Sequence, residues 1–169
     1  MGSNRFLAAT ALCLGLAGCS ADVIQLAAFG EPVRNHASHQ GRIDRLPNAE
    51  LVATGKLYFR DRDYGNAQAA YQKAVEIYPE NAEAWLGLAA SYDQLRRFDQ
   101  SKLAYKRLHA LVGGTSAFYN NRGFSLLLQS DVRGAITAFK TALRIDPTNQ
   151  VAENNLELIR QLSEAEARI

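Results

Sequence analysis

The sequence predicts an all-α protein, a solenoid of three helix-turn-helix repeats followed by a C-terminal capping helix. The main observation is that the chain resembles itself at a shift of 34 residues, which brings seven sets of residues into register. In these sets small and aromatic residues alternate as paired helices require, because a small side chain lets two helices approach and a ring fills the gap beside it. The sets are Leu51, Trp85 and Tyr119; Gly55, Ala89 and Gly123; Tyr58, Tyr92 and Leu126; Ala67, Ser101 and Ala135; Tyr71, Tyr105 and Phe139; Ala74, Leu108 and Ala142; and Pro79, Gly113 and Pro147.

Composition agrees with a single globular domain. The chain has 169 residues, of which 47% are apolar and 21% charged, and its formal net charge is +2. Neither sign forms a run of five or more charges. Nucleic acid is therefore not the expected partner, because binding by counterion release needs clustered cations.

Residues 1–18 have the organisation of a secretory signal peptide. Arg5 precedes the apolar run 6–16, and two small residues, Ala17 and Gly18, follow it. A run of 11 residues is too short to cross a hydrocarbon core of about 30 Å as a helix. We therefore expect this segment to be removed.

The four residues Leu16-Ala17-Gly18-Cys19 resemble the lipobox of bacterial lipoproteins. The resemblance implies that Cys19 becomes the lipidated first residue of the mature chain. Ser20, directly after that cysteine, resembles the sorting signal that sends lipoproteins to the outer membrane, which would leave the domain facing the periplasm. The alternative is an ordinary secretory signal that has a cysteine near its cleavage point.

Residues 19–47 are interpreted as the lipidated cysteine and a flexible linker. The segment contains glycine and proline at four positions, and no helical or strand period persists through it. His36 and His39 have a spacing that could serve a metal ion, but solvated linker histidines are the preferred interpretation, since no cysteine and few acids lie near them. We predict neither a metal site nor a cofactor.

The repeats span residues 48–81, 82–115 and 116–149. Their columns resemble the tetratricopeptide-repeat (TPR) family, whose pattern is W-x2-L-G-x2-Y, then A-x3-F, then P. Pro79 and Pro147 end helices because proline has no N–H to donate. The middle repeat departs from the pattern at Ser101, Leu108 and Gly113, so we expect it to pack more loosely.

Residues 150–169 form the predicted capping helix. A fourth repeat would need a small residue at position 157 and an aromatic residue at position 160, but Glu157 and Arg160 stand there. Three residues apart on one helix, they can form an ion pair on a polar outer face, as terminal repeats require. Val151, Leu158 and Ile159 are left to pack on the third repeat.

The resemblance implies that the first helices of the repeats line a concave face that binds a partner segment. Asn120 and Asn154 are one period apart, and their amides can both donate to and accept from a peptide backbone. The alternative is that these residues, with Asn121 and Asn155, bond structurally across helix turns. The predicted partner-binding residues are Asn120, Asn154, Leu86, Phe124, Leu127 and Leu158. Lys56 and Arg60 are too few to reproduce the carboxylate clamp of chaperone-binding members.

Catalysis is not predicted. His109 is the only histidine in the repeats, no phosphate-binding glycine motif is present, and Asp63 is better explained as a helix N-cap. The chain resembles bacterial TPR lipoproteins, especially those of the tight-adherence (Flp) pilus secretion system. That resemblance implies a scaffold that assists assembly by binding an envelope protein such as a secretin or a pilus component. The alternative is a regulatory or adaptor lipoprotein for a periplasmic peptidoglycan hydrolase or protease; the oligomeric state is left open.

Overall fold

The computed structural model describes residues 50–166. This part of the chain contains seven helices and no strand: α2 (Leu51–Arg60), α3 (Tyr64–Ile77), α4 (Ala82–Gln94), α5 (Phe98–Val112), α6 (Ser116–Leu128), α7 (Val132–Ile145) and α8 (Gln150–Glu166). The predicted signal peptide, Cys19, the linker and the last three residues of the cap lie outside the described residues.

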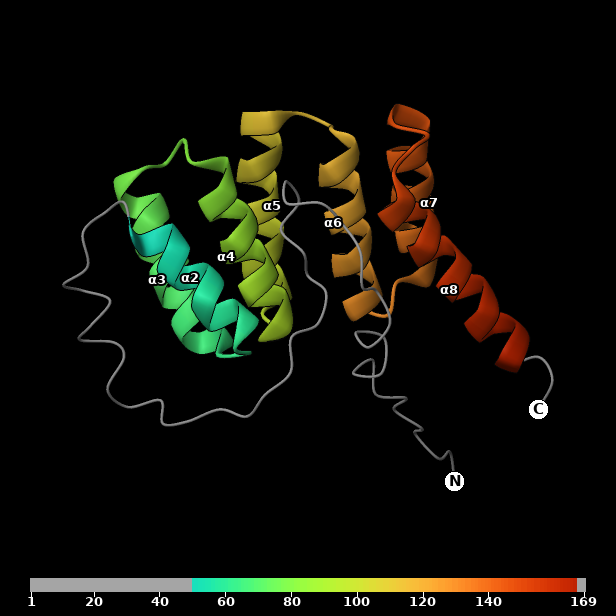
Figure 1. Ribbon diagram of the computed structural model, residues 1–169, viewed down its shortest axis with the longest axis horizontal. Coiled ribbons are helices and arrows are strands. Elements are labelled where there is room, and N and C mark those ends of the chain that lie inside the picture. Colours follow the sequence, from blue (N-terminus) through green and yellow to red (C-terminus); the bar gives the residue numbers. More distant parts are fainter. Residues whose placement is uncertain (1–49, 167–169) are drawn as a thin grey trace, which may run out of the picture.

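The helices form three pairs and a single terminal helix. The members of each pair, α2 with α3, α4 with α5 and α6 with α7, pack closely, and α8 lies against α7. In Figure 1 the array runs from α2 and α3 at one end to α8 at the other, with α2, α4 and α8 drawn in front of their neighbours α3, α5 and α7. The predicted all-α solenoid of three repeats and a capping helix is therefore confirmed.

Aromatic rings held against glycines fill the centres of the first and third pairs. Tyr71 and Phe139 are 1% and 0% exposed. A Cβ atom on Gly55 would lie 2.8 Å from the Tyr71 ring, and one on Gly123 would lie 2.7 Å from the Phe139 ring. Since real Cβ atoms do not approach so closely, only glycine fits at these positions, as the alternation of small and large residues predicts.

The buried apolar residues form two separate clusters. The first extends from Leu51 through the first two repeats to Phe118 at the start of α6. The second joins Phe139 of the third repeat to Ala152 of α8. Tyr119 is half-buried and packs against both clusters.

Short polar side chains begin most of the helices. Asp63 is the N-cap of α3, as predicted, and accepts a hydrogen bond from the backbone N–H of Asn66 at 3.2 Å. Asp131 does the same for α7, with the N–H of Gly134 at 2.9 Å. The equivalent residue in the middle repeat, Arg97, provides no side-chain cap to α5. The second helix of the middle repeat therefore begins with one fewer satisfied N–H group than its counterparts.

The turn inside each repeat has the same backbone conformation. Arg62, Arg96 and Ser130, spaced 34 residues apart, have φ angles of 60°, 57° and 64°. Residues with a Cβ rarely adopt this left-handed conformation. The repeats thus share a local backbone feature although different side chains occupy it.

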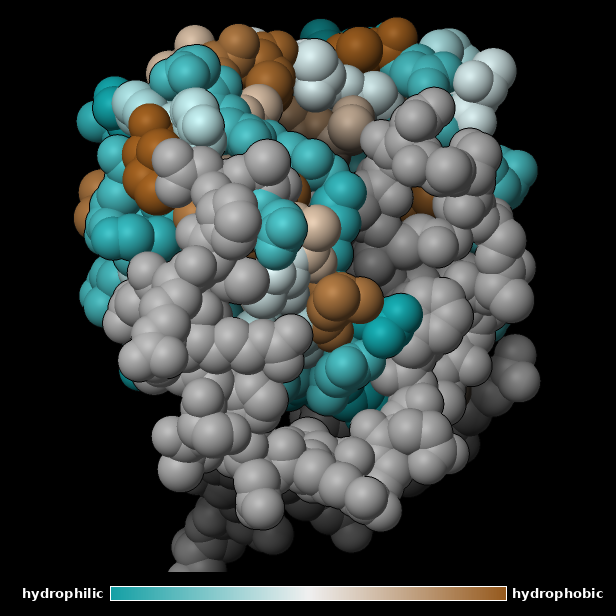
Figure 2. Space-filling view, turned by 60° about the vertical axis from the view of Figure 1, so that its left-hand side comes forward, coloured by the Kyte–Doolittle hydropathy of each residue, from teal (hydrophilic) through white to brown (hydrophobic). Residues whose placement is uncertain are grey.

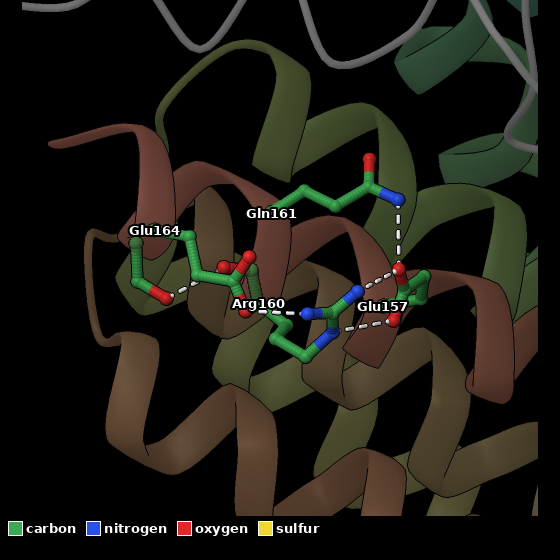
Figure 3. A network of polar contacts seen from close by, with 5 residues as sticks. Glu157, Arg160, Gln161 and Glu164 are labelled. Carbon is green, nitrogen blue, oxygen red and sulfur yellow. Dashed lines mark hydrogen bonds and ion pairs between the residues drawn. The ribbon is translucent and has the colours of Figure 1, made fainter. Parts of the chain in front are cut away.

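The outer face of α8 carries the predicted ion pair. The guanidinium of Arg160 donates to both carboxylate oxygens of Glu157, at 2.6 and 2.8 Å, and also contacts Glu164. Gln161 donates to Glu157 at 2.8 Å (Figure 3). The hydrogen bonds from Arg160 lower the pKa of Glu157 to about 2. Of the residues expected to pack on the third repeat, Ile159 contacts the second cluster, whereas Val151 and Leu158 are not part of it. Leu156 packs there as well, so α8 has the polar and apolar sides of a cap.

Candidate partner-binding face

The exposed sides of α2, α4, α6 and α8 form what we call the first-helix face. Four of the six predicted binding residues are half-buried apolar side chains on these helices. Leu86 packs against the first core cluster and Leu127 against the second. Phe124 and Leu158 belong to neither cluster, and each keeps part of its apolar surface exposed.

Asn120 differs from the expectation. Its side chain is only 6% exposed, and its Oδ1 accepts a hydrogen bond from Nδ2 of Asn155 at 3.1 Å. This bond joins α6 to α8 in a buried site. The geometry gives Asn120 a structural role in place of the predicted contact with a partner.

Asn154 remains half-buried on α8. Its Oδ1 accepts from Nε2 of Gln150 at 3.1 Å, one helical turn earlier. No hydrogen bond joins Asn154 to Asn120 in the described structure, so the two amides do not act as a pair. Asn121 is buried and donates to the carbonyl of Ala117 at 2.9 Å, which is the bond across a helix turn that the structural alternative describes.

Two cations of the first repeat, Lys56 and Arg60, are each paired with a neighbouring acid. Lys56 of α2 forms an ion pair with Glu83 of α4, which links the first two repeats across this face. Arg60 lies 3.1 Å from the carboxylate of Asp61. Consequently neither cation offers an unpaired charge to an acidic ligand.

A buried polar network joins α4 to α6, and sequence reasoning missed it. Asp93 is 3% exposed, and one of its carboxylate oxygens accepts a hydrogen bond from Oγ of Ser125 at 3.0 Å. Oγ of Ser125 in turn accepts from Arg122 and from Gln129, each at 3.1 Å. The period places residues 93 and 125 in neighbouring first helices, but nothing in the repeat pattern marks an acid for burial.

Burial raises the pKa of Asp93 above its usual value of 3.8. The hydroxyls of Ser101 and Ser125 and the charge of Arg122 act in the opposite direction without cancelling the effect of burial. Burial likewise raises the pKa of Tyr105 well above its usual value. These groups lie between the second and third repeats, where they hold helices together and are closed off from a ligand.

The visible surface has no single broad apolar area. In the view of Figure 2, brown hydrophobic residues form small groups separated by teal polar ones. Residues 50–166 contain no group of three or more His, Cys, Asp or Glu side chains placed to hold a metal ion. Nor does this stretch include a helix with the length and hydropathy needed to cross a membrane.

Two family models described as tetratricopeptide repeat match the chain, one over residues 58–116 and the other over residues 91–150. Together they cover most of the helical array. Residues 58–150 of the chain are therefore made of tetratricopeptide repeats.

Relatives of this TPR protein include a curated protein and several solved domains. It is 26% identical over 107 residues to the small glutamine-rich tetratricopeptide repeat-containing protein 2 of Mycosarcoma maydis, and the match covers 63% of this chain and 30% of that protein. The first TPR domain of human RPAP3 is similar with a TM-score of 0.61 and 23% identity, covering 72% of this chain and 95% of that domain. The first TPR of Spaghetti (RPAP3), solved with the HSP90 peptide SRMEEVD, is similar with a TM-score of 0.58 and 25% identity, covering 71% and 93%.

Proposed function

We propose that this TPR protein is a lipid-anchored scaffold of the bacterial envelope that binds a segment of a partner protein on its first-helix face. The observation that carries the proposal is the pair of half-buried apolar side chains, Phe124 and Leu158, which lie on that face and belong to neither core cluster. A partner segment that covered these two side chains would remove their remaining apolar surface from water, which favours binding. A structurally similar TPR domain has been solved with a bound peptide, which supports the same use of the fold here.

The chemistry of the face favours a neutral, apolar segment. The HSP90 peptide bound by the similar domain, SRMEEVD, contains three acidic residues and one arginine. In this chain Lys56 and Arg60 are already paired with acids, so an acidic peptide would have to displace those pairs. We therefore infer that apolar side chains of the partner meet Leu86, Phe124, Leu127 and Leu158, while the amide of Asn154 meets its backbone.

The proposed setting is assembly of a tight-adherence (Flp) pilus or a related secretion machine. The lipobox at Leu16-Ala17-Gly18-Cys19 and the three repeats together resemble TadD, the lipoprotein of that system. A secretin or another pilus-assembly component is the proposed partner. The protein would be held in the outer membrane by lipidated Cys19, with its helices in the periplasm.

Replacing the proposed anchor tests its location. Cys19→Ala should move the protein from the membrane fraction to the soluble periplasmic fraction of the producing bacterium. Fractionation followed by a high-salt wash measures this shift. A Cys19→Ala chain that stays in the washed membranes would contradict lipid anchoring.

The binding face is tested by a pair of matched double variants. Phe124→Gln with Leu158→Gln should abolish crosslinking to the secretin, while Leu103→Gln with Leu111→Gln should retain it, because these two exposed leucines lie on α5 instead. Circular dichroism must show unchanged helix content in both. If the first pair folds and still crosslinks at full yield, the partner binds elsewhere.

A further inference from the structure

Charge is segregated along the helical array, although the whole chain is nearly neutral. Residues 96–144 contain nine Lys and Arg but two Asp, a formal charge of +7. Residues 50–95 contain four cations and seven acids, a charge of −3, and residues 145–166 contain one cation and five acids, a charge of −4. The charges of residues 50–166 therefore sum to zero, but the cations are concentrated in the middle of the array and the acids at its two ends.

Most of these cations project from two second helices. Lys102, Lys106 and Arg107 on α5 and Arg133, Lys140 and Arg144 on α7 are all exposed, and we call them the basic face. Lys106 and Lys140 are 34 residues apart, so they occupy the same outward position in neighbouring repeats. The first-helix face lies on other helices, and in Figure 1 three of them, α2, α4 and α8, are drawn in front of α3, α5 and α7.

The basic face also differs in how its charges are compensated. Lys56, Lys73 and Arg160, in the acidic parts of the domain, each form an ion pair. None of the six cations of the basic face has an ion-pair partner among residues 50–166. The guanidinium carbon of Arg107 lies 5.8 Å from the centre of the Trp85 ring, and this neutral ring carries no negative charge to balance the cation.

We propose that the basic face rests on an anionic phospholipid surface. These cations hold no fixed hydrogen-bonded arrangement and are spread over two helices, which suits a fluid layer of headgroups better than the shaped pockets of a protein interface. Each cation near such a surface strengthens binding by about fivefold.

The proposal rests on the proposed lipid anchor for its biological setting. Thirty residues lie between Cys19 and Glu50, and at about 3.5 Å each they can span on the order of 100 Å, so any face of the domain can reach the bilayer. Anchoring raises the local concentration of lipid, so that a weak attraction is enough to orient the domain. In that orientation the first-helix face stays open to a partner.

Vesicle sedimentation tests the basic face without the anchor. The full chain carrying Cys19→Ala is mixed with vesicles of phosphatidylcholine containing about 30% phosphatidylglycerol, a composition chosen to give a strongly negative surface. Pure phosphatidylcholine vesicles measure any contribution from the apolar run 6–16. We expect binding only to the anionic vesicles, and loss of that binding in high salt.

Two double variants with equal charge change locate the contact. Lys106→Gln with Lys140→Gln should weaken binding by about 25-fold, which is fivefold for each cation. Lys56→Gln with Lys73→Gln, outside the basic face, should change it by about twofold or less. Equal losses in both pairs, equal binding to neutral vesicles, or binding to polyglutamate in place of vesicles would each overturn the proposal.

The vesicle result is independent of the proposed function. If Cys19→Ala fails to release the protein from cell membranes while the vesicle variants behave as expected, lipid anchoring is overturned and the basic face stands as a membrane contact. If Cys19→Ala releases the protein but the chain ignores anionic vesicles, the anchor stands and the basic face has no role in orienting the domain.

Discussion

The junction between the first and second repeats is tight, and the junction between the second and third is not. α3 lies along α4 over much of its length, whereas α5 and α6 approach each other at only a few residues. At the tight junction a Cβ atom on Gly87 would lie 2.3 Å from the Tyr71 ring, so the ring lies directly on the α4 backbone. One period later Tyr105 meets Asn121, to whose carbonyl its hydroxyl donates at 3.2 Å. A single residue on the first helix thus sets how closely the preceding repeat can approach.

Polar contacts replace apolar packing at the loose junction. The hydrogen bond from Ser125 to Asp93 crosses it, and the guanidinium of Arg122 lies 5.6 Å from the centre of the Tyr105 ring. The two apolar clusters divide in this region, since the first ends at Phe118 and the second begins in the third repeat. Because buried polar bonds add little net stability, the loose junction should open before the tight one does.

The largest expected effect comes from adding one methyl group at the tight junction. Gly87→Ala should lower the free energy of unfolding by about 2 to 3 kcal/mol, because the Tyr71 ring is buried on all sides and the helices must separate to admit it. Gly65→Ala is the matched control, since a Cβ there meets no atom closer than 4.0 Å on an exposed helix position.

The control substitution should raise stability by about 0.5 to 1 kcal/mol through helix propensity alone. Chemical denaturation should show that the free energy of unfolding falls in Gly87→Ala and rises in Gly65→Ala. If Gly87→Ala is also stabilising, the junction has more room than the structure gives it, and the contrast with Asn121 loses its basis.

Asp93→Asn should stabilise the protein at neutral pH, by on the order of 1 kcal/mol. Burial makes the charged form of Asp93 unfavourable, and an amide oxygen can still accept from Ser125. Because its pKa is raised in the folded state, the contribution of Asp93 to stability is complete below the pKa of the unfolded chain and is lost as pH rises through the folded pKa.

Melting temperatures of both proteins should therefore converge at acid pH and separate in favour of Asp93→Asn near pH 7. Comparing the two removes the effect of the other carboxylates, such as Glu157, whose lowered pKa acts in the opposite sense. Curves that stay parallel from pH 3 to pH 7 would mean that the charge on Asp93 carries no cost.

The period of 34 was enough to predict the fold, because each column is a packing contact that every repeat must make. Gly55 and Gly123 were found in this way, together with the rings that they contact. Gly87 was missed because its column continues with Asn121 and Asn155, which share no property with glycine. A contact made at one junction alone leaves no periodic signal.

The candidate site was harder to predict for the same reason. The apolar positions Phe124 and Leu158 follow from the repeat pattern, but the fate of each asparagine depends on how α8 is rotated against α6. That rotation buries Asn120 against Asn155 and leaves Asn154 half-buried. The expectation that the middle repeat packs more loosely was wrong. Its helices α4 and α5 pair closely, and the sparse packing lies between α5 and α6, at the junction with the third repeat.

Helix capping gives a smaller test of the middle repeat. Arg97→Asp would supply the side-chain acceptor that Asp63 and Asp131 provide to α3 and α7, and it should raise stability by about 1 kcal/mol. The converse change, Asp131→Arg, should lower stability by a similar amount. Urea denaturation of both variants measures the two changes in the free energy of unfolding. If both variants are less stable than the original protein, the contact of Arg97 with Gln68 at 3.5 Å contributes more than the missing cap would.

The smallest expected effect concerns the turns within the repeats. These turns share one backbone conformation, whereas the junctions between repeats differ. Arg62, Arg96 and Ser130 all hold a left-handed backbone that costs a residue with a Cβ about 1 kcal/mol. Glycine removes this cost but gives the unfolded chain more freedom, which offsets about half of the gain. Each single change to glycine should therefore raise stability by about 0.5 kcal/mol or less, and thermal melts should show three similar shifts. If Arg96→Gly alone gives a large shift, strain is concentrated in the middle repeat, and the loose junction must be attributed in part to its own turn and not to Asn121 alone.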